Sequence, residues 1–247
     1  LGPAAGILDE IHKNTGIKGD LVELDVTSSN SIAAALEQLT NVHGRVDVLI
    51  NNAALNPSVS NKSDDSKEWS RFEDFSTDVW NRDLDVGLTG AFLCSQIFGN
   101  HMKENKHGVI INIASDLALI APDQRIYRVE GLSEDMQPVK PVSYSVVKAG
   151  LVALTKYLAV YWADQGIRVN ALCPGGIFDN QDIGFVNKLS EEKKTKGCLG
   201  GDDENYTINK FKTFKCDHEK VNGTEGSICF HLKQKKPLVF SSYGKDS

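Results

Sequence analysis

A tyrosine and a lysine four residues apart are the pair in this chain whose spacing first suggests a reaction. Tyr144 and Lys148 lie in "SYSVVKAGLVALTKYLA", residues 143–159, a run of helix formers with an apolar stripe. On a helix, residues four apart share one face. A lysine ammonium near a phenol favours the phenolate and lowers the phenol pKa from its usual value of about 10. Such a pair can move a proton near neutral pH.

The spacing alone does not identify a site, because it occurs twice. Tyr206 and Lys210 in "YTINK" repeat it within a polar segment that has no strand pattern around it. We interpret that second pair as accidental. For Lys148 the simplest alternative is a solvated helix lysine, and for the neighbouring Leu151 it is a core contact.

The segments around the first pair alternate between strand and helix patterns. Nearly continuous apolar runs such as "RVDVLINNAA" are typical of strands buried on both faces of a parallel sheet. Strands are predicted at residues 21–27, 45–54, 107–115 and 167–173, and helices at 3–13, 29–39, 76–104 and 144–164. This βαβ alternation predicts an α/β fold with a Rossmann-like, doubly wound parallel sheet.

Polar residues follow several of these strands. Asn51, Ser115 and Pro174 each stand at or just past the carboxyl end of a predicted strand. Ligands of open α/β sheets bind at that edge. Taken singly, Asn51 is an ordinary turn residue and Ser115 an ordinary strand-end serine that caps a turn. Taken together with Tyr144 and Lys148, they predict one shared site.

The motifs "LINNAA", "INIAS", Tyr144-xxx-Lys148 and "VNALCPGG", in this order over residues 20–185, resemble the short-chain dehydrogenase/reductase (SDR) family. The resemblance implies NAD or NADP as cofactor and hydride transfer between an alcohol and a carbonyl. It implies that Tyr144 is the catalytic acid or base. Lys148 would hold the nicotinamide ribose and lower the tyrosine pKa, and Ser115 would bind the substrate oxygen.

The resemblance also implies a set of cofactor contacts. Asp25 and Val26 would lie against the adenine, although an aspartate at a strand end also commonly caps a helix. Asn51 and Ala53 would lie against the adenosine half, and the loop after the last predicted strand against the nicotinamide. The full implied set is Asp25, Val26, Asn51, Ala53, Tyr144, Lys148, Pro174, Gly175 and Ile177.

The sequence departs from the family pattern in three places. No glycine-rich TGxxxGxG turn is present, so we expect the sheet to lack the family's first two strands and to bind dinucleotide poorly. Gly87 stands where the family usually has an asparagine that holds a water molecule. The family's closing segment is also absent, so we expect the last strand to be missing. The predicted domains are a partial Rossmann-type SDR domain at 1–187 and an atypical, weakly ordered tail at 188–247.

Residues 116–142 form a longer connection than most members of the family have at this point. The segment looks like that of bacterial members that act on sugars or sugar derivatives. Arg125 and Arg128 within it suit recognition of an anionic group. The substrate is therefore predicted to be a small, sugar-like molecule, and the alternative is that the segment is a solvated flap.

Composition excludes several classes of partner. A net charge of -6 and a pI of about 5.5 argue against nucleic acid. No apolar run approaches the roughly 20 residues of a membrane helix. The five cysteines are scattered, which predicts a reducing, cytoplasmic setting. Two tight CxH pairs lie in the tail, and we do not expect them to bind metal. They are Cys216 with His218 and Cys229 with His231.

The leading hypothesis is therefore an NAD(P)-dependent oxidoreductase. One alternative is a non-catalytic or degenerate SDR fragment that is stable only with a partner. Another is an SDR-type sugar epimerase or dehydratase with tightly held NAD. The helices predicted at 76–104 and 144–164 resemble the pair through which family members dimerise, which implies a homo-oligomer.

Overall fold

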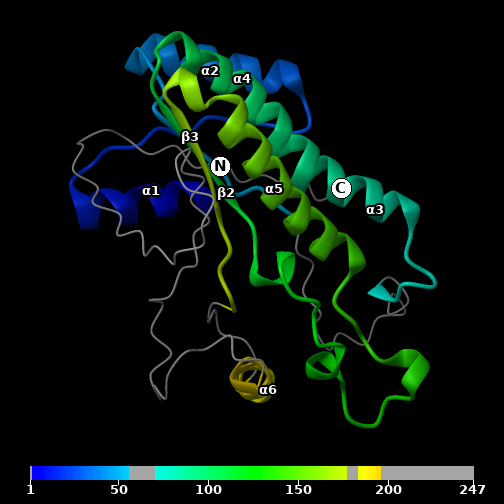
Figure 1. The fold of residues 1–247 in the computed structure, drawn as a ribbon. Helices are drawn as coiled ribbons and strands as arrows, with labels where there is room; N and C mark the ends of the chain where they lie inside the picture. Colours follow the sequence, from blue (N-terminus) through cyan, green and yellow to red (C-terminus); the bar gives the residue numbers. More distant parts are fainter. Residues whose placement is uncertain (1, 56–69, 177–182, 196–247) are drawn as a thin grey trace.

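The computed structural model describes residues 2–55, 70–176 and 183–195 (Figure 1). In these residues three strands alternate with helices, as the sequence predicts. The strands are β1 (Val48–Asn51), β2 (Gly108–Ile113) and β3 (Ile167–Leu172). The helices are α1 (Gly2–Thr15), α2 (Ser29–His43), α3 (Thr77–Leu84), α4 (Gly90–Glu104), α5 (Val142–Tyr161) and α6 (Ile183–Thr195).

The described strands form one parallel sheet in the order β1-β2-β3. Asn51 pairs with Asn112 and Ile113 with Leu172, so the strand ends lie in register at one edge. Each crossover runs through a helix, as a parallel connection requires. The predicted α/β class with a Rossmann-like parallel sheet is confirmed.

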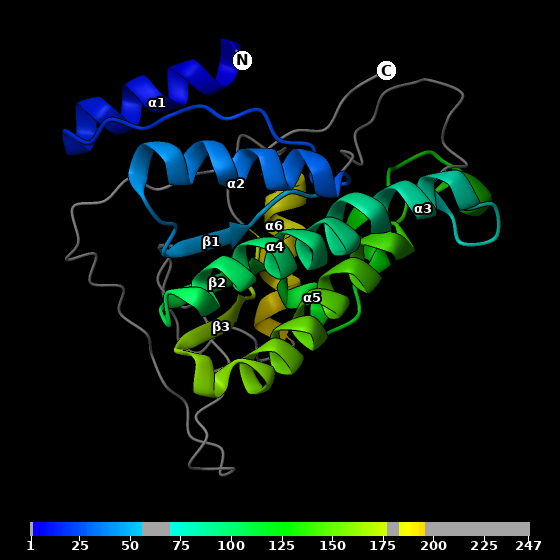
Figure 2. The ribbon, with the colours of Figure 1, turned by 90° about the horizontal axis from the view of Figure 1, so that it is seen from above.

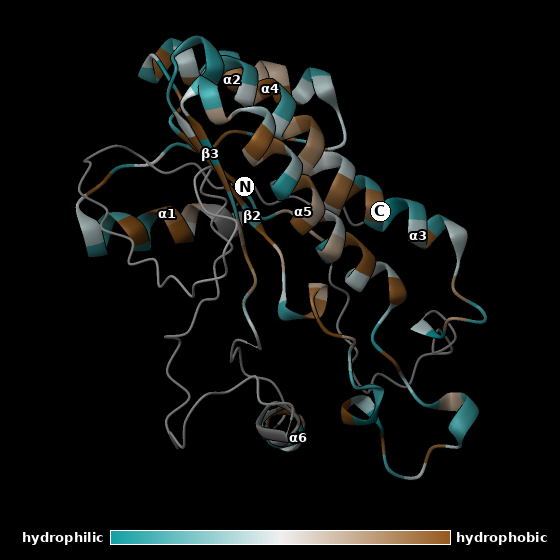
Figure 3. Ribbon diagram, in the orientation of Figure 1, coloured by the Kyte–Doolittle hydropathy of each residue, from teal (hydrophilic) through white to brown (hydrophobic). Residues whose placement is uncertain are grey.

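Helices α4 and α5 pack against one face of this sheet (Figure 2). Along β2 the buried residues alternate, with Ile110 and Asn112 fully buried and Ile111 only half-buried, because successive side chains point to opposite faces. Figure 3 shows apolar residues along the strands and mixed character along the helices. The buried cluster beneath α4 and α5 consists of Met102, Ile110, Leu158, Trp162, Ile167 and Val169.

A chain of hydrogen bonds crosses this apolar layer. The Asn51 side-chain amide donates to Ser95 Oγ at 3.0 Å and to Asn112 Oδ1 at 2.8 Å. The Asn112 amide donates in turn to Thr155 Oγ1 at 2.8 Å. Each buried polar group thereby gains a partner, which offsets its loss of water. The network ties β1 and β2 to α4 and α5 at the level where the strands end.

The prediction of a strand at residues 21–27 is wrong for the described structure. Val22, Leu24 and Val26 do alternate as strand residues do, and they pack against the core beside α2 and α4. No described segment lies beside them to complete a ladder, and the Asp25 backbone N–H instead donates to Ser31 Oγ at 2.9 Å. The apolar pattern is therefore satisfied by packing alone, without sheet hydrogen bonds.

The helix predicted at 76–104 begins at Thr77, where Ser76 caps it by accepting a hydrogen bond from the Asp78 N–H. It is interrupted by a π-helical turn at Asp85–Thr89. Glycines on and just after this turn permit close packing. A Cβ on Gly87 would stand 2.6 Å from Val147 Cγ1, and one on Gly90 would stand 2.9 Å from Val26 Cγ2. The turn therefore brings the chain backbone close to α5, near the position of Tyr144.

Helix α6 was not predicted from the sequence, and it runs across the boundary placed between residues 187 and 188. Residues 196–247, with the Tyr206 and Lys210 pair and the two CxH pairs, lie outside the described residues, as does Ile177. Among the helices that the structure describes, none is both long and apolar enough to cross a membrane.

Candidate active site

Ser115, Tyr144 and Lys148 lie together at the carboxyl edge of the sheet. Ser115 follows β2, and its Oγ accepts from the Leu117 N–H at 3.2 Å, capping a short 3₁₀ turn. Tyr144 is in the first turn of α5, and its hydroxyl lies close enough to Ser115 for the serine to lower the Tyr144 pKa. Lys148 lies one turn further along α5, with Nζ 5.7 Å from the centroid of the Tyr144 ring. The helix spacing thus brings the three predicted catalytic side chains into one site.

Lys148 is fixed by the end of β2. Its side chain is buried, with 6 % of its surface exposed, and Nζ donates to the Ile113 carbonyl at 2.7 Å. Burial lowers the pKa of Lys148 to about 8, and the nearby Cys173 opposes this shift. The amine therefore titrates much closer to neutral pH than an exposed lysine does.

The pKa of Tyr144 is raised, mainly because the phenol is buried. Its hydrogen bond with Ser115 opposes this rise, while the negative charge of Asp116 adds to it. The predicted lowering of this pKa by Lys148 is wrong for the structure described. The lysine is turned toward the Ile113 carbonyl, so the cost of burying a phenolate outweighs its attraction to the ammonium.

Two further charged residues adjoin the tyrosine, and neither was assigned a role from the sequence. One is Asp116, whose Oδ1 accepts a hydrogen bond from Ser115 Oγ at 3.0 Å. The sequence could have indicated Asp116 only because it directly follows Ser115. Lys140 Nζ lies 3.8 Å from the centroid of the Tyr144 ring, a cation–π contact. Burial, and next the charge of Lys148, lower the pKa of Lys140 to about 8. The site therefore combines two amines with the phenol.

A small pocket opens on the other side of Tyr144. Asp83 of α3 lines it although nothing in the local sequence marked this residue as functional. Ser143 Oγ donates to Asp83 Oδ2 at 2.5 Å, which joins α3 to the start of α5. The pocket lining comes from the loop after β1, from α3 with its π-helical turn, and from α5. These residues are Ala54, Leu55, Asp83, Gly87, Ser143, Tyr144, Val147 and Lys148.

The predicted adenosine contacts have structural partners of their own. The Asn51 side chain lies in the buried network described above, and Ala53 packs against the core near α2. Val26 is buried in that same cluster. Asp25 Oδ1 accepts from both the N–H and the hydroxyl of Thr27, at 2.9 Å and 2.7 Å. These four residues shape the sheet edge, and their cofactor contacts stay a prediction.

The loop after β3 lies beside Ser115. The Asp116 N–H donates to the Pro174 carbonyl at 3.0 Å, which joins the ends of β2 and β3. Gly175, the next residue, is exposed at this edge. The two positions predicted to face the nicotinamide therefore adjoin Ser115, while Ile177 lies outside the described residues.

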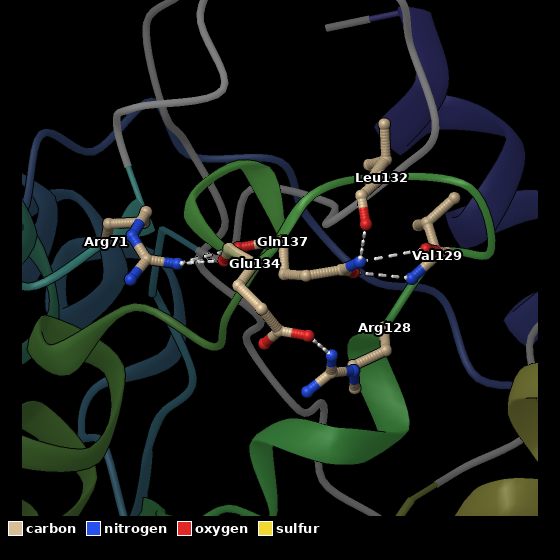
Figure 4. A network of polar contacts seen from close by, with 6 residues as sticks. All are labelled: Arg71, Arg128, Val129, Leu132, Glu134 and Gln137. Atoms are coloured by element: carbon tan, nitrogen blue, oxygen red, sulfur yellow. Dashed lines mark hydrogen bonds and ion pairs between the residues drawn. The ribbon is translucent and has the colours of Figure 1, made fainter.

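The 116–141 segment is held by its own side chains and by Arg71, which donates to the Glu134 carbonyl at 3.0 Å (Figure 4). The Gln137 amide accepts from the Val129 N–H at 2.8 Å and donates to the Val129 and Leu132 carbonyls at 3.0 Å and 2.8 Å. Arg128 pairs with Glu134, which Figure 4 also shows. The Arg125 guanidinium pairs with Asp123. Both arginines predicted to bind an anion are thus paired with carboxylates of their own segment.

Comparison with known proteins places the chain in a family. The short chain dehydrogenase family profile matches residues 2–181. Glucose 1-dehydrogenase 2 of Bacillus subtilis (strain 168) is 34% identical over 188 residues, which is 76% of this chain and 63% of the relative. This chain belongs to the short chain dehydrogenase family.

Solved structures give the same result. A short chain dehydrogenase from Leptospira borgpetersenii with bound NAD+ is 34% identical, with a TM-score of 0.55, and the match covers 66% of this chain and 56% of that one. A gluconate 5-dehydrogenase from Burkholderia cenocepacia in complex with NADP and tartrate is 25% identical, with a TM-score of 0.57, covering 74% and 63%. The chain thus spans about three fifths of the length of the relatives it matches.

Proposed function

We propose that this protein is an NAD(P)-dependent oxidoreductase that interconverts an alcohol and a carbonyl by hydride transfer. The observation that carries the proposal is the proximity of Ser115 and Lys148 to the Tyr144 phenol at the carboxyl edge of the sheet. Family membership and the NAD+- and NADP-bound relatives support it. Within such a site a phenol can transfer a proton while hydride moves to or from the adjacent carbon.

The residues present fit a nicotinamide beside Ser115. Gly175 presents exposed backbone there without a side chain, and Pro174 is held to Asp116. Bound in that place, NAD or NADP would supply or accept the hydride. Lys148, with Asn51 and Ala53 at the neighbouring strand end, would help to hold it.

The protein's own residues supply the proton chemistry. Ser115 Oγ would hold the substrate oxygen next to the Tyr144 hydroxyl. The Tyr144 phenol is protonated at neutral pH and can donate to a carbonyl oxygen, and its raised pKa makes this transfer depend on groups that stabilise the phenolate. Lys140 and Lys148 would stabilise the phenolate that remains, since both amines lie near the ring.

We propose that the substrate is a polar, sugar-like molecule. Two relatives are named for glucose and gluconate, and one holds tartrate. Lys140, whose Nζ lies 3.8 Å from the centroid of the Tyr144 ring, would meet a substrate carboxylate at the site itself. A cytoplasmic location stays a prediction from the cysteine content.

The proposal is tested by following the absorbance of reduced nicotinamide. The full chain would be assayed with NADH and NADPH against a panel of sugar ketones and aldehydes, beside Tyr144→Phe. The phenylalanine variant keeps the ring and loses the proton, so turnover should fall by about 10²–10⁴-fold. Equal turnover in the two proteins would contradict the proposed role of Tyr144.

The alternatives give different results in this assay. An epimerase or dehydratase forms product without net change in nicotinamide absorbance. A non-catalytic relative shows no turnover with any substrate of the panel, and calorimetry then determines whether it binds the dinucleotide at all.

We also propose a homo-oligomer formed through α4 and α5. Phe92 on α4 is 45% exposed, and Tyr157, Val160 and Tyr161 on α5 are each more than 60% exposed. Burial of these apolar side chains between two copies would be favourable. We propose a second copy of this chain as the partner because the family resemblance implies that these two helices form the dimer contact.

A further inference from the structure

Asp83 is a buried carboxylate whose two oxygens differ in their hydrogen bonding. The residue is 6% exposed, and its Oδ2 accepts the hydrogen bond from Ser143. Oδ1 is also buried, and among the described residues it has no hydrogen-bond partner. An unpaired buried carboxylate oxygen costs free energy, and native proteins rarely retain one without a use for it. The arrangement indicates that Oδ1 serves something other than packing.

The pocket beside Asp83 is the same one that Tyr144 and Lys148 line. Gly87, one helical turn after Asp83, contributes backbone only, and a Cβ at that position would press on Val147. The lining is thus polar at Asp83, Ser143, Tyr144 and Lys148 and lacks a side chain at position 87. The pocket also has an apolar side, at Ala54, Leu55 and Val147, but a hollow lined by several donors and acceptors can hold water.

We propose that Asp83 is a proton-exchanging residue of this site, which passes protons through pocket water to and from Lys148 and Tyr144. The proposal rests on the proposed function and deepens it. It assigns to Asp83 the role of returning the proton that the phenol gives up. Asp83 touches neither substrate nor hydride, so it is a positioning and relay group rather than a catalytic residue.

Each proton that moves in this step has a stated donor and acceptor. When a carbonyl is reduced, the O–H bond of Tyr144 breaks and its proton moves to the substrate oxygen, while the nicotinamide supplies the hydride. Oδ1–H of Asp83 then gives a proton to a pocket water, which passes one on to the phenolate directly or by way of the Lys148 amine. The Asp83 carboxylate regains a proton from bulk water. Alcohol oxidation runs the same steps in reverse.

The surroundings of Asp83 suit this role. Burial raises the pKa of the Asp83 carboxyl, against the opposing effects of the Ser143 hydrogen bond and of the Arg82 charge. The carboxyl therefore binds a proton at a higher pH than an exposed aspartate does, and closer to the range in which Lys148 titrates. The titratable groups around it are Arg82 on α3, Asp85 on the π-helical turn, and Tyr144 and Lys148 on α5.

The test is the pH profile of turnover in Asp83→Asn. Asparagine keeps an oxygen for Ser143 and the size of the side chain, but it cannot release a proton. We expect kcat to fall by about 10²-fold or more with KM little changed, and the part of the pH profile that reports Asp83 to disappear. The matched control is Asp85→Asn, an exposed aspartate two residues along, which should keep the wild-type profile.

A second readout does not depend on turnover. In the full chain labelled with ¹³C at the aspartate carboxyls, the titration of Asp83 should move to higher pH in Lys148→Met, because a positive charge that stabilises the carboxylate has been removed. The titration of Asp85 serves as the internal reference. A shift would show that the charge of Lys148 reaches Asp83 across the pocket, as the relay requires, whereas a purely structural link between Asp83 and Ser143 predicts none.

The outcomes separate this proposal from the proposed function. If the wild-type chain reduces no carbonyl while Asp83 still responds to Lys148→Met, the proposed function fails and the coupling stands. If the wild type is active and Asp83→Asn keeps both its rate and its pH profile, the relay is overturned. An Asp83 titration that ignores Lys148 overturns it as well.

Discussion

At the scale of single residues, the site depends on burying amines that would be more stable in water. Lys148 is buried, and its pKa falls from 10.5 to about 8 because burial penalises the ammonium. One pKa unit corresponds to about 1.4 kcal/mol. The hydrogen bond to the Ile113 carbonyl offsets part of this cost. A group that lowers stability in this way is expected to be kept for its chemistry.

Replacing Lys148 by Met should therefore stabilise the protein while abolishing turnover. The folded-state pKa lies below the unfolded one, so the penalty is complete below about pH 8 and is lost as pH rises toward 10.5. We expect a gain of roughly 1–3 kcal/mol in the free energy of unfolding at pH 7, which disappears at high pH. Urea unfolding at several pH values measures it. The exposed Lys156→Met should show no such pH dependence, and a loss of stability at pH 7 would contradict the argument.

The three residues of the candidate site could be singled out from the sequence because each stands in a short local motif. Ser115 ends a strand pattern, and Tyr144 and Lys148 share a helix face. Asp83 and Lys140 could not be predicted, because they reach the site through the tertiary packing of α3 and of the 116–141 segment. The direction of the Tyr144 pKa was missed for the same reason, since burial and the turning of Lys148 toward Ile113 are properties of the folded chain.

At the scale of elements, the turn between α5 and β3 sets where the last described strand begins. Gly166 has a φ of +73°, and a Cβ there would stand 2.2 Å from the Lys106 carbonyl oxygen. Its own carbonyl accepts from the Gly108 N–H, which aligns β2 with β3. This glycine is required both by its left-handed backbone and by the close approach of the neighbouring chain.

Gly166→Ala should lower the free energy of unfolding by about 2–4 kcal/mol, because backbone strain and a clash with a main-chain atom act together. Gly131 provides the matched control. Its φ of +84° is equally unusual, but a Cβ there would meet nothing within 4 Å. Gly131→Ala should therefore cost only about 1 kcal/mol, the strain alone. Thermal unfolding of the two variants makes the comparison, and equal costs would show that the contact with Lys106 is unimportant.

Most elements could be predicted from periodicity, since the three described strands and α2 to α5 fall where the apolar pattern placed them. The strand at 21–27 could not be, because alternation reports which side chains are buried and not whether a neighbouring strand supplies hydrogen bonds. The π-helical turn at Asp85–Thr89 was likewise not predictable. It depends on how closely α5 approaches Gly87, which no local pattern records.

At the scale of the whole molecule, the exposed apolar side chains of α5 determine the proposed self-association. Tyr157 and Tyr161 stack with ring centroids 5.7 Å apart, so they present a continuous apolar surface. Introducing a charge there should disfavour burial between two copies. The effect should be confined to association, because neither side chain belongs to the buried core.

The double variant Tyr157→Asp, Val160→Asp should therefore weaken association by 100-fold or more in sedimentation velocity, with an unchanged unfolding transition of the monomer. Val42→Asp on α2 is the control, since Val42 is 67% exposed on a different helix. A wild-type chain that sediments as a monomer at all concentrations would contradict the proposed interface.

The buried amides that connect Asn51 to Asn112 and Thr155 have a consequence for how the chain finds its fold. Two apolar strands can pair in more than one register and still bury apolar surface, so hydrophobic burial alone does not select a single register. Shifting β2 by one residue would turn Asn112 to the opposite face and break its hydrogen bonds with Asn51 and Thr155, at a cost of about 0.5–1.5 kcal/mol for each bond. The network therefore favours the observed strand register in the protein without a ligand. This register sets where the strand ends that carry Ser115 and its neighbours lie relative to one another.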